Sequence, residues 1–306
     1  MSLISKYAVM GNPVSHSLSP RIHQMFARQC DIALQYSAIE VEEGAFQAAV
    51  SQFRDEGGKG LNITVPFKQQ AWHLADQRSS RAELAGAVNT LKFNGEDSIF
   101  GDNTDGAGML RDLTTNLAKQ VSGARILIIG AGGAVRGVLG PLLEMQPLIL
   151  HIANRTAAKA RDLAAVFSEF GPCTASGLDE LGGVSYDIVI NGTAASLQGK
   201  VPDLPARILT NETLAYDMMY GKQATPFMLW ASKNGVTQCS DGLGMLVEQA
   251  AESFFIWHGV KPVTKPVLQA LRKDSNVTGI LRPCLTSNGV SFFVLIYFNE
   301  YNKGVF

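Results

Sequence analysis

The feature that most constrains the fold is a short apolar run that ends in a glycine-rich turn. Arg125–Ile129 is too short for a typical helix and is followed at once by Gly130-Ala131-Gly132-Gly133-Ala134. This order predicts a buried strand, a tight turn and the start of a helix. Backbone N–H groups at such a turn can approach a phosphate, as a dinucleotide-binding βαβ unit requires. Val135 replaces the third glycine of the usual fingerprint, so the turn alone also fits an ordinary strand-to-helix connection.

The end of the next predicted strand favours NADP over NAD. A helix is expected over 134–144 and a buried strand over 148–153, which ends at Asn154-Arg155-Thr156. An NAD site usually carries an acid there for the ribose 2′-hydroxyl, and this stretch has none. Arg155, and Lys159 one helical turn later, place positive charge where the 2′-phosphate of NADP lies. The alternative is that both are solvated cations at a helix start, but their position makes NADP(H) the better prediction.

Length and composition exclude several protein classes. A chain of 306 residues with 46% hydrophobic and 17% charged residues fits a globular protein of two domains. With 26 basic and 27 acidic residues there is no basic field for nucleic acid. No apolar window has the length of a membrane span, and no secretory signal is visible. We therefore expect a cytoplasmic protein, a monomer or homodimer, whose partner is a small molecule.

The cysteines do not form a recognisable site. They are scattered along the chain, without a Cys-x-x-Cys pair, at Cys30, Cys173, Cys239 and Cys284. This spacing argues against both a zinc site and a disulfide framework. No metal is expected.

The first hundred residues alternate between apolar runs of strand length and amphipathic stretches. A helix is expected to begin at Ser19-Pro20, with the serine as its cap, and another spans 44–54. Strands are expected at 7–10, 35–39, 60–65, 87–91 and 98–101. This part predicts a small α/β domain without a glycine-rich phosphate turn.

The same alternation continues after the glycine-rich turn. Strands are expected over 186–191 and 214–217, and helices over 245–258 and about 266–273. The pattern predicts a Rossmann-type, doubly wound parallel sheet. The fold class is thus α/β with two domains and a cleft between them: residues 1–105 plus 243–273 for the substrate, and residues 106–242 for NADP. Residues 274–306 form a tail without an assigned role. It contains an aromatic run at 292–298 that suits a partner surface, an aggregation-prone edge or a non-native extension.

Polar residues gather at the ends of the predicted N-terminal strands. They are Ser15-His16-Ser17, then Asn62, Thr64 and Lys68, then Asn89, and finally Asp102-Asn103-Thr104-Asp105. Carboxyl ends of strands face one edge of an α/β domain, so these groups are expected to converge. Each alone is more often a cap or a turn former. Four such clusters favour a site for a small, highly hydroxylated ligand.

Lys68 and Asp105 are the candidates for proton transfer. Lys68 follows Pro66 in the first turn of a predicted helix, and Asp105 is its obvious partner. The alternative is a solvated lysine together with an aspartate that caps a helix beginning at Gly106. The spacing alone leaves these two interpretations open.

Several motifs together resemble the shikimate dehydrogenase family. They are Gly11–Pro20 (GNPVSHSLSP), Asn62–Lys68 (NITVPFK), Ala85–Thr90 (AGAVNT), Gly101–Gly106 (GDNTDG), Gly130–Ala134, Asn154–Thr156 and Asp241–Leu246 (DGLGML). They span about residues 6 to 272. The resemblance implies NADPH-dependent, reversible reduction of 3-dehydroshikimate to shikimate, a step in aromatic amino-acid biosynthesis.

The resemblance also implies roles for residues. Lys68 and Asp105 would be the catalytic pair, and Ser15 and Ser17 would bind the substrate carboxylate. Other substrate contacts would be Asn62, Thr64, Asn89, Asp105, Tyr220 and Gln249. The cofactor would contact Gly130, Ala131, Gly132, Gly133, Ala134, Asn154, Arg155, Thr156, Lys159, Met218 and Gly242.

The chain also departs from the family pattern. Lys159 stands where many members carry Arg, and residues 191–196 (NGTAAS) replace the usual Asn-Ala-Thr-Ser-Ser-Gly. One rival interpretation is therefore a quinate/shikimate dehydrogenase with relaxed cofactor use. Another is a non-catalytic module that senses NADP or a shikimate-like acid. A dehydrogenase for a folate-like substrate fits less well, because the N-terminal motifs supply no aromatic stacking residues.

Overall fold

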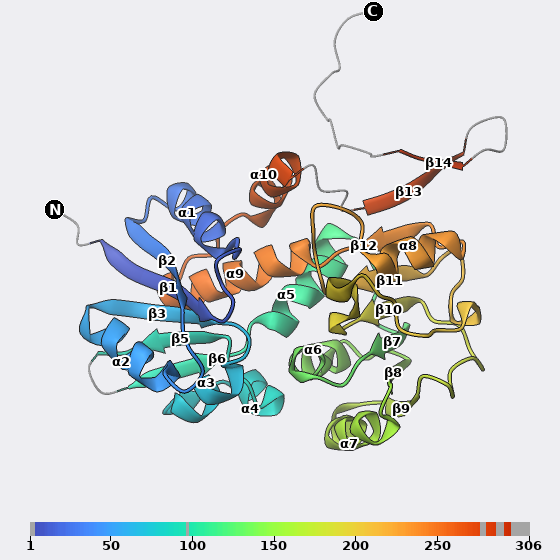
Figure 1. Cartoon of the computed structure of the whole chain (residues 1–306), viewed down its shortest axis with the longest axis horizontal. Coiled ribbons are helices and arrows are strands. Elements are labelled where there is room, and N and C mark those ends of the chain that lie inside the picture. Colours follow the sequence, from blue (N-terminus) through green and yellow to red (C-terminus); the bar gives the residue numbers. More distant parts are fainter. Residues whose placement is uncertain (1–3, 96–97, 276–279, 286–290, 295–306) are drawn as a thin grey trace, which may run out of the picture.

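The computed structural model describes residues 4–95, 98–275, 280–285 and 291–294. The chain forms two α/β halves, each built on its own sheet, with helices α5 and α9 between them (Figure 1). This architecture confirms the predicted fold class. No helix in the described ranges has the length and apolar character needed to cross a membrane.

The first sheet has the strand order β2-β1-β3-β5-β6-β4. Strands β2, β1 and β3 are parallel, whereas β5 runs antiparallel to both β3 and β6. The strands are β1 (Ser5–Gly11), β2 (Leu34–Glu40), β3 (Gly58–Ile63), β4 (Gln77–Arg78), β5 (Thr90–Phe93) and β6 (Ile99–Asp102). The helices of this half are α1 (Ser19–Gln29), α2 (Phe46–Asp55), α3 (Lys68–Leu74) and α4 (Ser80–Ala85).

Strand β1 shows why this sheet is buried on both faces. Successive side chains of a strand point to opposite faces. Ala8 and Met10 accordingly join the apolar cluster that contains α2 and α3 residues, while Tyr7 and Val9 pack with Trp257 of α9. Helix α9, distant in sequence, therefore closes the second face of the N-terminal sheet.

The second sheet has the order β14-β13-β12-β11-β10-β7-β8-β9, and its strands are parallel from β12 to β9. These are β7 (Arg125–Ile129), β8 (Ile149–Asn154), β9 (Cys173–Gly177), β10 (Ile188–Asn191), β11 (Leu214–Asp217) and β12 (Gln238–Ser240). The helices are α6 (Gly133–Glu144), α7 (Ala157–Phe167), α8 (Pro226–Lys233) and the short turns η2 (Ser168–Phe170), η3 (Ala194–Gln198) and η4 (Ala206–Ile208). Both faces of the sheet are covered, which explains the unbroken apolar run of β7.

Two helical segments pack around α9. Helix α5 (Asp105–Arg111), extended by the π-helical turn η1 (Asp112–Asn116), packs against α9 (Leu243–His258) and α6. Helix α10 (Thr264–Ser275) returns to α9 and α1, as the helical pattern predicts. A Cβ on Gly108 of α5 would lie 2.6 Å from the Gln249 backbone N of α9, so this close crossing requires glycine.

The structure differs from the predictions in some elements. Strand β5 begins at Thr90 rather than at residue 87, because the Val88 N–H donates to the Lys68 carbonyl instead of to a neighbouring strand. Helix α1 includes Ser19, so this serine is not the residue before the helix. In the tail, β13 (Ile280–Leu285) and β14 (Ser291–Val294) add antiparallel strands beyond β12. Residues 295–298 of the aromatic run lie outside the described residues. The division into residues 1–105 plus 243–273 and residues 106–242 stays our proposal.

Candidate functional site

A cavity of about 360 Å³ lies between the two halves. The N-terminal half contributes the ends of β1 and β3 and the starts of α1 and α3, and the other side comes from the segment after β11 and from α9. The lining residues are Val9, Pro13, Val14, His16, Ser17, Ser19, Asn62, Ile63, Thr64, Lys68, Asn89, Asp105, Met218, Tyr220, Gly242, Met245, Leu246 and Gln249. Polar residues that follow β1, β3 and β6 thus converge, as the sequence predicts. Asn89 joins them from the start of the antiparallel strand β5 and not from a strand's carboxyl end, so its predicted position is wrong although it reaches the same edge.

Lys68 and Asp105 form an ion pair in this cavity. Lys68 is the first residue of α3 and Asp105 the first of α5, and Lys68 Nζ lies 2.5 Å from Asp105 Oδ2. The side chains are 24% and 11% exposed, so the pair is largely shielded but reachable from the cavity. A carboxylate in the first turn of a helix also interacts favourably with the helix dipole. The structure therefore brings together the two residues that the sequence could only name as candidates.

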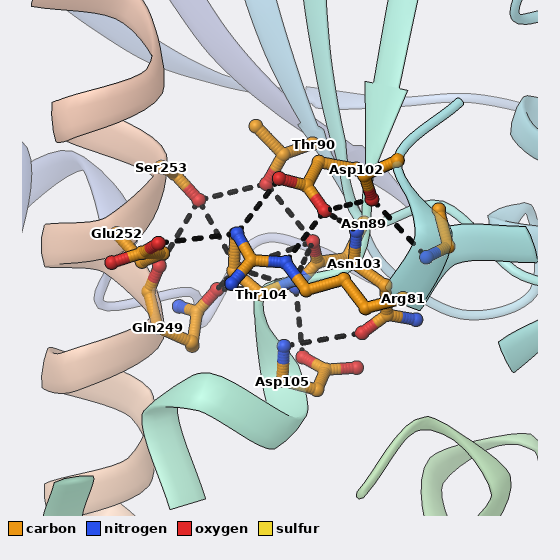
Figure 2. Close-up of polar contacts among 12 residues, drawn as sticks. Arg81, Asn89, Thr90, Asp102, Asn103, Thr104, Asp105, Gln249, Glu252 and Ser253 are labelled. Atoms are coloured by element: carbon orange, nitrogen blue, oxygen red, sulfur yellow. Dashed lines mark hydrogen bonds and ion pairs between the residues drawn. The ribbon is translucent and has the colours of Figure 1, made fainter. Parts of the chain in front are cut away.

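Asn89 fixes the other oxygen of Asp105. Its Nδ2 donates to Asp105 Oδ1 at 2.8 Å and to Thr104 Oγ1 at 2.9 Å (Figure 2). Its Oδ1 accepts from the Thr104 backbone N–H at 2.9 Å. Gln249 of α9 approaches the same amide, with Oε1 3.4 Å from Asn89 Nδ2. Asp105 is thus held between a cation and an amide on a rigid, buried frame.

The side chain of Asn62 forms hydrogen bonds to other residues through both its oxygen and its nitrogen. Its Oδ1 accepts from the Tyr36 hydroxyl at 2.7 Å, and its Nδ2 donates to Ser253 Oγ at 2.9 Å. Burial raises the pKa of Tyr36 well above its ordinary value of 10.0, so this hydroxyl keeps its proton and remains a donor. Asn62 lines the cavity while tying β3 to β2 and α9.

The serines near the N-terminus are placed unequally. Ser17 lines the cavity, whereas Ser15 is exposed and is not among the lining residues. Ser19, which the sequence analysis treats only as a helix cap, lines the cavity and is 6% exposed. The Ser19 N–H donates to Ser17 Oγ at 3.3 Å, which holds the two serines close together. The signal in the sequence is their spacing at a helix start, where two hydroxyls separated by one residue lie near one helix N-terminus.

The C-terminal half contributes Met218, Tyr220 and Gly242 to the lining. A Cβ on Gly242 would overlap the Met218 carbonyl oxygen, so the segment after β11 can meet the start of α9 only with glycine there. Asp217, immediately before Met218, is fully buried and accepts from Ser196 Oγ at 2.6 Å and Thr225 Oγ1 at 2.6 Å. These bonds fix the loop after β10 and the start of α8 beside the cavity.

The glycine-rich turn fits a dinucleotide phosphate. Gly130 has φ +111°, a conformation that favours glycine, and a Cβ there would lie 3.3 Å from the Gly192 carbonyl oxygen. Gly132 precedes α6 and provides no side-chain cap, so its first N–H groups have no capping partner in the described structure. Gly132, Gly133 and Ala134 are exposed, and the space beside both glycines is open. An anion can therefore reach the helix N-terminus directly.

The residues predicted to select NADP lie at the next strand end. Asn154 ends β8 and donates to the Thr156 carbonyl at 3.0 Å, which shapes the turn into α7. Arg155, Thr156 and Lys159 are all exposed, so their side chains are accessible to a phosphate. The end of β8 therefore presents basic side chains and has no acidic residue at positions 154–156.

Comparisons with known proteins match segments of both halves of the chain. Residues 9–91 match the shikimate dehydrogenase substrate binding domain, and residues 112–200 match the shikimate / quinate 5-dehydrogenase family. Residues 242–272 match the shikimate 5′-dehydrogenase C-terminal domain. The chain belongs to the shikimate dehydrogenase family. The resemblance stated from the motifs is therefore confirmed.

Individual members of the family are similar over nearly their full length. The shikimate dehydrogenase (NADP(+)) of Marinobacter nauticus is 53% identical over 88% of this chain and 98% of its own. That of Hahella chejuensis is 52% identical over 87% of this chain and 98% of its own. Among solved structures, an Ael1 enzyme from Pseudomonas putida has 48% identity and a TM-score of 0.82, covering 87% of this chain and 98% of its own. Shikimate 5-dehydrogenase from Thermus thermophilus in complex with NADP(H) and shikimate has 31% identity and a TM-score of 0.79, covering 88% and 99%.

Proposed function

We propose that this chain catalyses the reversible, NADPH-dependent reduction of 3-dehydroshikimate to shikimate. The observation that carries the proposal is the Lys68–Asp105 pair at the wall of a polar cavity that both halves line. Relatives named shikimate dehydrogenase (NADP(+)) support it at 48 to 53% identity. A cytoplasmic location and a monomeric or homodimeric state stay predictions.

The substrate is a small hydroxylated acid, and the lining suggests how it is held. Hydroxyl and amide groups from Thr64, Asn89, Tyr220 and Gln249 can bond ring hydroxyls, with Asp105 as an acceptor. Ser17 and Ser19 offer neighbouring hydroxyls at the start of α1 for the carboxylate. The role of Ser15 stays a prediction from the resemblance, because its side chain is exposed outside the cavity lining.

Lys68 is proposed to donate the proton during reduction and to accept it in the reverse direction. NADPH supplies the hydride when bound, and the residues of this chain stabilise the charge that results. Negative charge builds on the carbonyl oxygen during reduction, so the Lys68 ammonium can stabilise it and donate a proton. Asp105 orients Lys68 through the 2.5 Å contact. In the reverse direction neutral Lys68 accepts the proton from the substrate hydroxyl.

The cofactor is proposed to lie along the carboxyl edge of the second sheet. Its diphosphate would meet the N–H groups at Gly130–Ala134, and its 2′-phosphate would meet Asn154, Arg155, Thr156 and Lys159. Met218 and Gly242 line the cavity at the end where the two sites join. The open glycines at the start of α6 support this placement.

A comparison of substrates and cofactors tests the proposal against its nearest rival. Initial rates are measured for shikimate and quinate, each with NADP+ and with NAD+. We expect shikimate with NADP+ to give the highest kcat/KM, because quinate carries an additional ring hydroxyl that a cavity of about 360 Å³ must accommodate. Efficient oxidation of quinate with NAD+ would assign the chain to the quinate/shikimate type instead.

A further inference from the structure

Arg81 of α4 forms a bidentate ion pair directly behind the cavity wall. Its Nε donates to Asp102 Oδ1 at 2.7 Å and its Nη2 to Asp102 Oδ2 at 2.7 Å (Figure 2). The Asp102 side chain is only 6% exposed, and that of Arg81 27%. Neither residue lines the cavity. A paired, bidentate geometry fixes orientation as well as charge, which a single point contact does not.

Two hydrogen bonds connect Asp102 to Asp105 through Asn103. Asp102 ends β6, and its Oδ1 accepts from the Asn103 N–H at 2.7 Å. Asn103 Oδ1 in turn accepts from the Asp105 N–H at 3.1 Å, and Asn103 Nδ2 donates to the Ala87 carbonyl at 3.1 Å. The corner between β6 and α5 is therefore held by side chains on both sides of the turn. Arg81 is the charged group at the base of that corner.

The same guanidinium reaches the helix that carries Gln249. Arg81 Nη2 lies 3.2 Å from Glu252 Oε1 on α9, one helical turn beyond Gln249. Figure 2 shows Arg81 with its contacts to Asp102 and to Glu252 of α9. Arg81 thus connects the two elements that face the Lys68–Asp105 pair.

We propose that Arg81 is a positioning residue for Asp105, acting through Asp102 and Asn103. This inference rests on the proposed function, because it assigns Asp105 a part in the reaction. Arg81 does not line the cavity, so its contribution is to hold the Asp105 backbone where the carboxylate meets both Lys68 and Asn89. A displacement of about 1 Å in a catalytic group costs about 10²-fold in rate. Loss of Arg81 is therefore expected to affect kcat more than KM.

The experiment compares three variants of the full chain. Arg81→Gln should lower kcat by about 10²-fold, with KM for shikimate changed less than about threefold. Arg81→Lys keeps the charge toward Asp102 but replaces the bidentate pair with a single point contact, so it should restore only a small part of kcat. Arg78→Gln is the matched control, because Arg78 is similarly exposed but donates to the Trp72 and Ala75 carbonyls and to Glu83 instead. We expect Arg78→Gln to lower the melting temperature and to leave kcat near the wild-type value.

A double-mutant cycle with Asp105→Asn shows whether Arg81 acts through Asp105. If it does, Arg81→Gln has little further effect on kcat in the Asp105→Asn background. Equal effects in both backgrounds, or a kcat for Arg81→Gln within about twofold of wild type, would overturn the inference. A loss of kcat that follows the loss in melting temperature for both arginines would overturn it too. Absence of shikimate turnover by the wild-type protein would instead refute the proposed function.

Discussion

Helix α5 has a buried carboxylate at each end, and the two are surrounded very differently. Asp105, its first residue, contacts the Lys68 ammonium and accepts from the Asn89 amide. Asp112, directly after its last residue, is 2% exposed, and within the described residues its carboxylate accepts from neutral donors only. These are the Tyr216 hydroxyl at 2.7 Å and the Asn116 amide at 3.0 Å.

Asp112 has charged neighbours of both signs but makes no ion pair in the described part of the chain, whereas Asp105 contacts a cation directly. Burial raises the pKa of Asp112 to about 6; the bonds from Asn116 and Tyr216 and the charge of Arg272 act against this rise, and the nearby Glu248 adds to it. Burial likewise raises the pKa of Asp241, although Arg272 Nη2 lies 2.9 Å from its Oδ1. Asp241 Oδ2 and Glu248 Oε2 accept no hydrogen bond within the described structure. The far end of α5 is therefore a region of unfavourable burial.

The difference separates a site for chemistry from a site that limits stability. Asp105 and Lys68 open onto the cavity, so substitutions there should change turnover with little effect on folding. Asp112 is enclosed by α9 and β11, so substitutions around it should change folding with little effect on turnover. Three experiments test this separation.

The largest effect is expected at the cavity end. Lys68→Ala removes the proton donor and the charge next to the reacting oxygen, so kcat should fall by at least about 10³-fold. KM for shikimate should change little, because the other lining groups still bind it. Steady-state kinetics with NADP+ measures both.

Lys92 provides the matched control for this substitution. It is another partly buried lysine of the N-terminal half, on strand β5, and its Nζ donates to the Ile256 carbonyl at 2.9 Å. Lys92→Ala should keep kcat near the wild-type value. A near-normal rate for Lys68→Ala would remove the catalytic assignment and favour a non-catalytic module that senses its ligands.

A smaller effect, and one on folding, is expected from Gly244→Ala in α9. A Cβ at this position would overlap the Asp112 carboxylate, which Tyr216 and Asn116 hold in place. Overpacking of this kind should lower the free energy of unfolding by about 2 kcal/mol. Urea unfolding measures the cost of Gly244→Ala in two backgrounds. Gly244→Ala is compared with the wild type, and Asp112→Ala/Gly244→Ala is compared with Asp112→Ala. The cost should largely disappear when Asp112 is alanine; an equal cost in both would mean that the carboxylate is not the obstacle.

The sequence predicts the cavity end of α5 far better than the other end. Lys68 and Asp105 begin helices and Asn89 directly precedes β5, and local patterns place such positions at the ends of strands and helices. The glycine-rich turn and the basic strand end after β8 are likewise local signals. Even there Ser19 is missed, because a serine before proline also fits a simple helix cap.

The cluster of buried acids at the far end of α5 cannot be predicted from the sequence, because it forms only when the helices pack. Asp112 is far in the chain from Asp241 and Glu248 and meets them only where the end of α5 packs against α9. Each residue alone resembles a solvated surface acid. The contact between Asp112 and α9 requires glycine at position 244. Gly244 lies at the start of α9, and nothing in the neighbouring sequence indicates that this glycine packs against a distant carboxylate.

The smallest effect is the dependence of stability on pH through Asp112. Its pKa is raised from 3.8 to about 6 in the folded state, so the folded protein binds the proton more tightly than the unfolded chain. The contribution of Asp112 to stability is therefore present below about pH 4 and is lost as the pH rises through 6. Between pH 5 and pH 8 the wild type should lose on the order of 1 kcal/mol relative to Asp112→Asn.

The measurement is the free energy of unfolding of both proteins at several pH values. The other titrating groups are common to the two proteins, so their contributions cancel in the difference between the two free energies. A hydrogen bond that asparagine changes by the same amount at every pH shifts this difference by a constant and does not affect its dependence on pH. The difference should grow with pH and level off above about 7, since Asp112 is then ionised in both states. A difference that stays constant from pH 5 to pH 8 would mean that the carboxylate at this end of α5 is as well accommodated as Asp105, and the contrast between the two ends would fail.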